Sequence, residues 1–152
     1  MNVMKFKIYQ LLFIPVIVAV IAMGCKKVAP NQFLKDNVTI VGYNPVIASF
    51  TTTPAGTTTA VAGSTVKLDL RYWSDDPIDK INLNATVGSG GKANVSSTGY
   101  QKAYSTVSRT DSLNLQYQVP AGTAVGTIIT VEAQVVNKNS LTATSTINLK
   151  VQ

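Results

Sequence analysis

One cluster of acidic side chains could support metal chemistry. Asp75, Asp76 and Asp79 place three carboxylates within five residues, on both sides of Pro77. Carboxylate oxygens in a turn are ligands that Ca²⁺ prefers, so this segment is a candidate calcium site. The alternative is turn chemistry, because aspartate bonds the backbone of its own loop and Lys80 would neutralise part of the charge. The sequence supports both interpretations.

Three aromatic residues are candidates for binding a ligand. Trp73 is the only tryptophan of the chain, and Tyr100 and Tyr104 follow further along it. Flat, exposed rings stack on sugars and anchor protein interfaces. The alternation of the preceding residues predicts that Tyr72 points inward and Trp73 outward. The alternative is that Trp73 lies over the end of the fold beside Pro77.

The residue types that support most enzyme chemistry are missing from the sequence. The chain has no histidine and a single cysteine, which excludes Cys/His zinc sites, Ser-His-Asp triads and internal disulfides. Glu132 is the only glutamate and is expected on a strand facing solvent, without a second carboxylate beside it. The glycine-rich run 88–91 precedes an expected strand rather than a helix, so it is not a phosphate loop. We therefore predict no catalytic residues.

The net charge of +6 at pH 7 raises nucleic acid as a partner. Lys5 and Lys7, however, belong to the N-terminal segment described next, and the other basic residues of the chain are scattered. Binding to phosphates requires several basic side chains on one face. We therefore expect no nucleic-acid partner.

The first 24 residues have the layout of an export signal. Two lysines precede an apolar run over residues 11–23, which is shorter than the roughly 20 residues that span a bilayer. Ala22-Met23-Gly24, directly before Cys25, resembles the lipobox of bacterial lipoproteins. The resemblance implies cleavage between Gly24 and Cys25 and lipidation of Cys25 by an acyl chain such as palmitate. The alternative is an uncleaved membrane anchor that ends in an ordinary thiol.

Residues 25–37 are expected to form the lipidated cysteine and a flexible tether, because Pro30 lies in a stretch without hydrophobic period. A lipoprotein cysteine carries two or three acyl chains, which attach a domain stably to a membrane. The expected location is the bacterial cell envelope, on the outer membrane. For the Bacteroidetes lipoproteins that this segment resembles, export to the cell surface is favoured by acidic residues directly after the cysteine. Lys26 and Lys27 stand there instead, so the periplasmic face is preferred.

The remainder of the chain, residues 38–152, is predicted to form one all-β domain. Apolar and polar residues alternate with period two, which is typical of half-buried strands, and turn residues separate the runs. Seven or more short strands of this kind predict an antiparallel β-sandwich. Clear strands are expected over residues 65–72, 81–87, 113–119, 129–135 and 141–151, and weaker ones over 38–41, 46–50, 57–61, 93–97 and 103–107.

Two parts of this domain resemble bacterial immunoglobulin-like domains. Residues 74–83 are similar to the exit of strand B and the entry of strand C, and residues 119–131 and 137–151 are similar to the E-F-G end. The resemblance covers roughly residues 46–152 and implies an immunoglobulin-like β-sandwich of the kind found in Bacteroidetes lipoproteins. In calcium-binding relatives an acid commonly stands near the position of Asn137, and the amide here weakens the calcium hypothesis.

These features predict a non-catalytic, membrane-anchored lipoprotein that acts as a protein-binding or spacer module. We expect a monomer whose partners are the membrane, through its lipid anchor, and another envelope protein. The alternative is a glycan-binding lipoprotein that uses exposed aromatics around Trp73. No cofactor is expected beyond the candidate Ca²⁺. Asp111-Ser112-Leu113 resembles a short O-glycosylation motif of the Bacteroidetes, which makes Ser112 a candidate modified residue.

Overall fold

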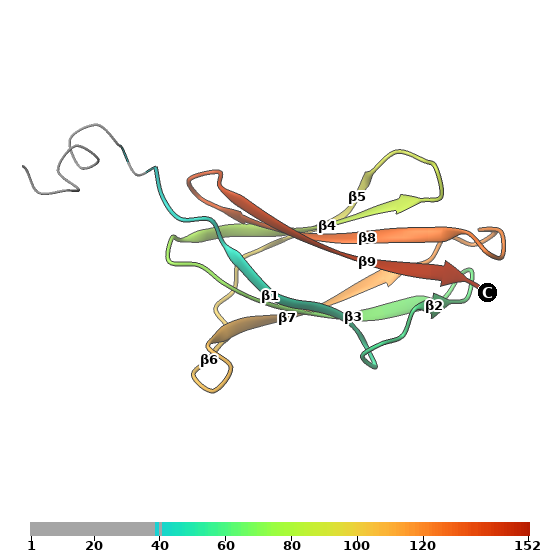
Figure 1. Ribbon diagram of the computed structural model, residues 1–152, viewed down its shortest axis with the longest axis horizontal. Coiled ribbons are helices and arrows are strands. Elements are labelled where there is room, and N and C mark those ends of the chain that lie inside the picture. The colour runs from blue at the N-terminus through green and yellow to red at the C-terminus, as the bar shows by residue number, and fades with distance from the viewer. Residues whose placement is uncertain (1–38, 40) are drawn as a thin grey trace, which may run out of the picture. The chain divides into compact units, whose positions relative to one another are not determined.

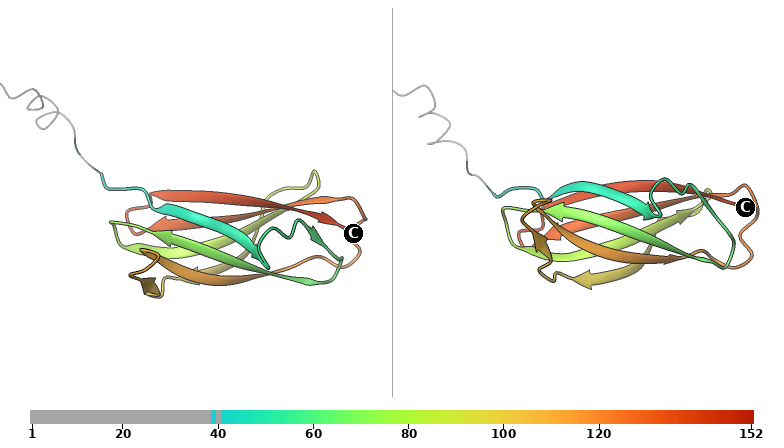
Figure 2. Two further views of the ribbon diagram at one scale, coloured as in Figure 1. Left: turned by 60° about the horizontal axis from the view of Figure 1, so that its bottom comes forward. Right: turned by 90° about the horizontal axis from the view of Figure 1, so that it is seen from below.

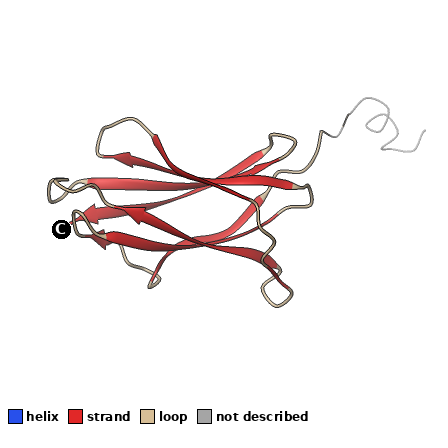
Figure 3. Ribbon diagram, turned by 180° about the vertical axis from the view of Figure 1, so that it is seen from behind, coloured by secondary structure: helices blue, strands red, loops and turns tan. Residues whose placement is uncertain are grey.

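Strands account for all the regular structure in the computed structural model, which describes residues 39 and 41–152 (Figure 3). This part of the chain forms no helix. The described residues therefore contain no helix that is long and apolar enough to cross a membrane. The predicted signal peptide, Cys25 and the tether lie outside the described residues. The strands are β1 (Val46–Thr53), β2 (Thr59–Ala60), β3 (Thr65–Trp73), β4 (Ile78–Val87), β5 (Ala93–Gly99), β6 (Tyr104–Ser105), β7 (Thr110–Gln118), β8 (Ile128–Asn137) and β9 (Thr142–Val151).

The strands form two sheets that pack face to face (Figure 1). One sheet has the order β1-β3-β7-β6 and the other has the order β2-β9-β8-β4-β5. Neighbouring strands are antiparallel, except that β2 and β9 run parallel. The chain changes sheets between β1 and β2, so these two strands lie at the edges of different sheets. This order is that of an immunoglobulin-like β-sandwich, and it confirms the predicted fold class.

The alternating pattern of the sequence places the core between the two sheets. In β3, Val66, Leu68, Leu70 and Tyr72 are buried, whereas the residues between them face outward. The same alternation buries the inward residues of β8 and most of those of β4 and β7. Each large apolar side chain removed from water in this way stabilises the fold by about 1.5–3 kcal/mol. The predicted inward and outward faces of these strands are therefore confirmed.

Three of the weaker strand predictions need correction. In the range 38–41, the described residues Thr39 and Val41 lie outside any strand. The strand predicted over 57–61 shrinks to β2, and the one over 103–107 shrinks to β6. Both short strands lie at a sheet edge with a single neighbour, so few backbone hydrogen bonds hold them. The parallel pairing of β2 with β9 also departs from the antiparallel prediction.

The sandwich has two ends with different loops. The start of β1, the β3–β4 and β8–β9 turns and β6 lie at one end, which we call the Trp73 end after the last residue of β3 (Figure 1). Two further views place β6 and the start of β1 at this same end (Figure 2). At the opposite end, which we call the far end, β1 stops, β2 begins and β9 finishes. The loops at the Trp73 end hold most of the candidate residues.

Candidate functional site

The Trp73 end carries an open pocket of about 500 Å³, a size typical of small-molecule sites. The pocket lies where the end of β3 meets β6, the β6–β7 turn and the start of β7. Strand register brings these segments together, because Asp111 of β7 is the partner of Tyr72 on one side and of Tyr104 on the other. The pocket is lined by Trp73, Ser74, Asp75, Tyr104, Arg109 and Asp111.

Two of the predicted ligand-binding residues present exposed rings at this pocket. Trp73 is 38% exposed and Tyr104 is 49% exposed. Trp73 follows the buried Tyr72 in β3, so strand alternation turns it toward the outer side, as predicted. Rings that are apolar on their faces and lie beside polar groups can stack on a sugar or anchor a protein interface.

Asp111 is a buried carboxylate whose two oxygens are both bonded. It is 5% exposed, its Oδ1 accepts a hydrogen bond from the Ala103 backbone N–H at 2.7 Å, and its Oδ2 accepts one from the Tyr100 hydroxyl at 3.2 Å. These bonds tie the β5–β6 connection to β7. Tyr100 is consequently half-buried against the core and does not offer the exposed ring that the sequence suggested.

The buried carboxylate also affects the titration of its tyrosine neighbours. Burial, together with the charges of Asp111 and Tyr100, raises the pKa of Tyr72 to about 12. Burial is likewise the main cause that raises the pKa of Tyr100, and the charge of Asp111 and its hydrogen bond add to it. A phenolate here would place a second negative charge in a partly desolvated site. Both hydroxyls are therefore protonated at neutral pH.

Arg109 is the pocket residue that the sequence does not single out, since it is one of several scattered bases. It is exposed in the β6–β7 turn, with a left-handed backbone at a φ of 54°. Within the described part of the chain, its guanidinium has no ion-pair or hydrogen-bond partner. Two other basic side chains of the described residues do form ion pairs, Arg71 with Asp69 at 3.1 Å and Lys92 with Glu132 at 3.0 Å. The described lysines other than Lys92 form none.

The three predicted calcium ligands occupy different surroundings. Asp75 lines the pocket and Asp79 is exposed in β4. The Oδ2 atom of Asp76 accepts hydrogen bonds from the Tyr43 backbone N–H at 2.6 Å and from the Asn139 side chain at 2.8 Å. Among residues 39 and 41–152, no group of three or more His, Cys, Asp or Glu side chains is arranged to hold a metal ion. The hydrogen bonds of Asp76 show that its carboxylate holds the turn and the entering chain together. Calcium binding stays a prediction.

Asn137 fixes the point at which the chain enters the sandwich. It is 1% exposed, and its side-chain nitrogen donates to the Tyr43 carbonyl at 3.0 Å and to the Ser74 hydroxyl at 2.8 Å. Its Oδ1 atom has no partner within the described residues. Gly42 has a φ of +146°, and a Cβ there would collide with the Asp76 carboxylate. The entering chain is therefore held beside the pocket.

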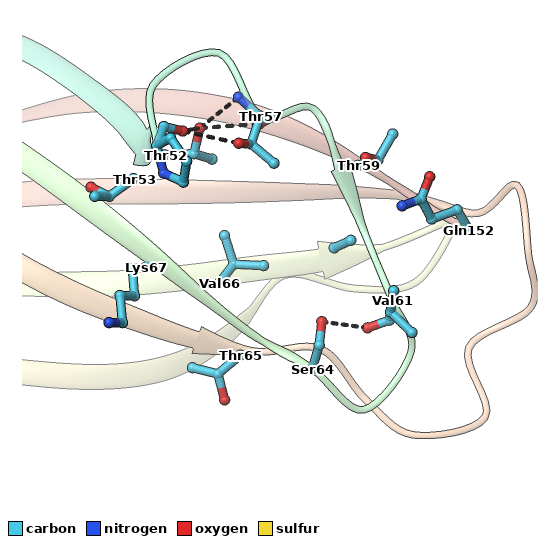
Figure 4. A pocket seen from close by; sticks show the side chains of 12 residues that line it. Thr52, Thr53, Thr57, Thr59, Val61, Ser64, Thr65, Val66, Lys67 and Gln152 are labelled. Carbon is cyan, nitrogen blue, oxygen red and sulfur yellow. Dashed lines mark hydrogen bonds between the residues drawn. The ribbon is translucent and has the colours of Figure 1, made fainter.

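A second pocket, of about 520 Å³, lies at the far end between the end of β1, β2 and the start of β3 (Figure 4). Its wall is rich in hydroxyls that bond the loop between β1 and β2. The Thr52 hydroxyl lies within hydrogen-bonding distance of the Pro54 and Thr57 carbonyls, at 2.9 and 3.1 Å, and accepts from the Thr57 N–H at 3.0 Å. None of its lining residues is aromatic, and Lys67 is the one charged side chain among them.

The remaining chemistry-bearing residues lie apart from both pockets. The Glu132 carboxylate accepts hydrogen bonds from Lys92 and from the Asn84 side chain on the outer face of the five-stranded sheet. Ser112 is exposed on β7, and its glycosylation stays a prediction. Gly24 and Cys25 lie outside the described residues, so their processing also stays a prediction.

Comparisons with known proteins identify neither a family nor a function for this chain. No family model matches the sequence, and no curated protein sequence matches it. A superoxide reductase (neelaredoxin) from Ignicoccus hospitalis is 10% identical over 81% of this chain and 93% of its own, with a TM-score of 0.48. The PKD domain of an M14-like peptidase from a Thermoplasmatales archaeon is 13% identical over 72% of this chain and 97% of its own, with a TM-score of 0.44. A Niemann-Pick type C2 protein from the Japanese carpenter ant is 7% identical over 73% of this chain and 95% of its own, with a TM-score of 0.47.

Proposed function

We propose that the protein is a non-catalytic, membrane-anchored lipoprotein that binds a glycan at the pocket of the Trp73 end. One observation carries the proposal. The exposed rings of Trp73 and Tyr104 line one open pocket, and the exposed polar groups of Asp75 and Arg109 line the same pocket. Sugar rings have apolar faces that stack on such rings, and hydroxyls that exchange hydrogen bonds with charged side chains.

The proposed anchor is the lipid on Cys25, formed after removal of residues 1–24. It would hold the protein in the bacterial cell envelope, on the outer membrane with the periplasmic face preferred. The chain enters the sandwich at Tyr43, whose backbone is bonded to Asp76 and Asn137 beside the pocket. A glycan in the pocket would therefore lie at the end of the domain that carries the tether.

A glycan array tests the proposed function. The full-length protein, purified in neutral detergent, should be retained on a defined subset of glycans, and Trp73→Ala should weaken that retention by about tenfold because a stacking platform is lost. Thr144→Ala, on the exposed face of β9, is the matched control and should bind as the wild type does. Retention on no glycan, or retention that does not depend on Trp73, would contradict the proposal.

A protein-binding or spacer module is the second candidate function. Tyr43 is 56% exposed and Val107, between β6 and β7, is 95% exposed, and both belong to the loops of the Trp73 end. Tryptophan, tyrosine and arginine are the residues most enriched at binding hot spots. A photo-cross-linking residue at position 107 should then give one discrete adduct in cells, which Trp73→Ala removes. A blank glycan array together with such an adduct would favour this candidate.

The lipid anchor has a separate test. Cys25→Ser removes the thiol that would be acylated, so unprocessed precursor should accumulate and labelled palmitate should not be incorporated. The measurement is metabolic labelling followed by electrophoresis of wild type and variant. A Cys25→Ser chain that still lost its signal and kept a membrane-bound acyl group would show that the anchor is wrongly placed.

A further inference from the structure

The charged side chains of the pocket at the Trp73 end are not equally available to a ligand. Asp111 is 5% exposed and both of its oxygens are bonded inside the protein, to Ala103 and to Tyr100. Arg109 is exposed, and no carboxylate of the described residues pairs with it. The pocket therefore presents an open guanidinium in the same lining as the Trp73 ring.

The turn that carries Arg109 does not explain the choice of this residue. Its φ of 54° lies in the left-handed region, which glycine, asparagine and aspartate adopt at lower cost than arginine. The side chain also forms no ion pair within the described residues, in contrast to Arg71, which contacts Asp69 at 3.1 Å. Neither the backbone nor the packing of the protein accounts for a guanidinium at this position.

We infer that the ligand of this pocket is an acidic sugar, whose carboxylate is bound by Arg109 while its ring stacks on Trp73. The inference rests on the proposed glycan function and adds the charge of the ligand. A guanidinium matches a carboxylate with two parallel, charge-assisted hydrogen bonds, which a neutral sugar cannot offer. Asp75, which also lines the pocket, accepts hydrogen bonds from sugar hydroxyls.

The overall charge of the chain agrees with an acidic ligand. The formal net charge is +6 at pH 7, and it stays at +4 when Lys5 and Lys7 are removed with residues 1–24, so a polyanionic glycan is attracted at long range before it reaches the pocket. At short range, Arg109 is the basic residue that distinguishes an acidic sugar from a neutral one, because it is the one basic residue in the pocket lining. Raising the salt concentration should therefore weaken binding of acidic sugars and leave binding of neutral sugars unchanged.

The single tryptophan makes the test direct, because the intrinsic fluorescence of the full-length protein reports on Trp73. The probes are trigalacturonic acid, its neutral counterpart galactotriose, and the peptide triglutamate. At low salt the wild type should bind trigalacturonic acid about tenfold more tightly than galactotriose, as expected for charge-assisted hydrogen bonds. Arg109→Gln and Arg109→Gly should reduce this ratio to near one, because the affinity for trigalacturonic acid should fall about tenfold relative to the affinity for galactotriose. Arg71→Gln, at the paired arginine, should leave the ratio intact.

Arg109→Gly also separates binding from folding. Glycine suits the left-handed backbone, so this variant should unfold at the same urea concentration as the wild type or a higher one. Equal affinities for the acidic and neutral sugars in the wild type, or a ratio that survives Arg109→Gln, would overturn the inference while leaving the glycan proposal standing. An Arg109-dependent response to triglutamate with no response to either sugar would overturn both in favour of an acidic peptide.

Discussion

The two ends of the sandwich carry pockets of nearly equal volume, about 500 and 520 Å³, but with different chemistry. At the far end, the Thr52 hydroxyl is bonded to the Pro54–Thr57 loop, so the polar wall serves the fold. At the Trp73 end, Trp73 and Arg109 keep a ring and a guanidinium exposed to solvent. Volume does not distinguish a binding site from a gap between strands. The distinction is whether the polar groups are already bonded within the protein.

The largest effect on this comparison is expected from Leu68→Ala, because both ends rest on one core. Leu68 is 1% exposed in β3, between the two ends. Its truncation loses transfer free energy and leaves a cavity, so the free energy of unfolding should fall by about 2–4 kcal/mol. Urea melts followed by Trp73 fluorescence and by circular dichroism should shift together. Separate transitions for the two signals would show that the ends do not share a cooperative core.

Alkaline pH should distinguish the two ends through their buried tyrosines. The folded-state pKa of Tyr72 is raised to about 12, so the unfolded chain loses this proton at lower pH than the folded one. The stability that Tyr72 contributes is therefore fully present below about pH 10 and is lost as the pH rises to about 12, by up to about 2–3 kcal/mol.

The check on this prediction is a series of urea melts across that pH range. Tyr72→Phe should flatten the fall in stability. Tyr117→Phe should flatten it less, because Tyr117, the register partner of Val66 near the far end, has its pKa raised by burial without a neighbouring carboxylate. Equal effects of the two variants would contradict the contribution of Asp111.

Removing the Thr52 hydroxyl should lower the stability of the domain without changing ligand binding at the Trp73 end. Thr52→Val keeps the shape of a side chain that is 5% exposed but leaves the Thr57 backbone N–H without its acceptor, so the free energy of unfolding should fall by about 1–3 kcal/mol. Ligand-induced changes in Trp73 fluorescence should stay as in the wild type. Thr53→Val, at the exposed neighbouring position, is the control and should change little.

The smallest effect is expected at a residue that belongs to neither pocket. Thr144 is exposed in β9, so Thr144→Ala should change the free energy of unfolding by about 0.5 kcal/mol or less. A loss as large as that of Leu68→Ala would mean that the inward and outward faces are exchanged, since a slip of one residue moves every side chain of a strand to the other face. Chemical denaturation of both variants decides the point.

The sequence alone predicted which face of each strand is buried and which single residues are candidates for the site. It did not predict that these residues form a pocket. Period-two alternation predicted the burial of Tyr72 and the exposure of Trp73, because it reports directly on which side of a sheet each residue lies. The pocket depends on the register that places Asp111 between Tyr72 and Tyr104, and such long-range pairing leaves no local signal. Arg109 was not found because a left-handed turn has no signature when its residue is not glycine.

The route of the chain through the sandwich determines how the domain responds to stretching. The chain enters at Tyr43 and β9 finishes at the opposite end, so a pull between the two acts along the strands (Figure 1). At the edge of the sheet, Lys150 N–H donates to the Thr58 carbonyl at 2.8 Å, and Gln152 N–H donates to the Ala60 carbonyl at 3.0 Å. Because β2 and β9 are parallel, such a force shears these bonds together instead of opening them one after another. A domain pulled between Tyr43 and the end of β9 should therefore bear tension without unravelling from β9.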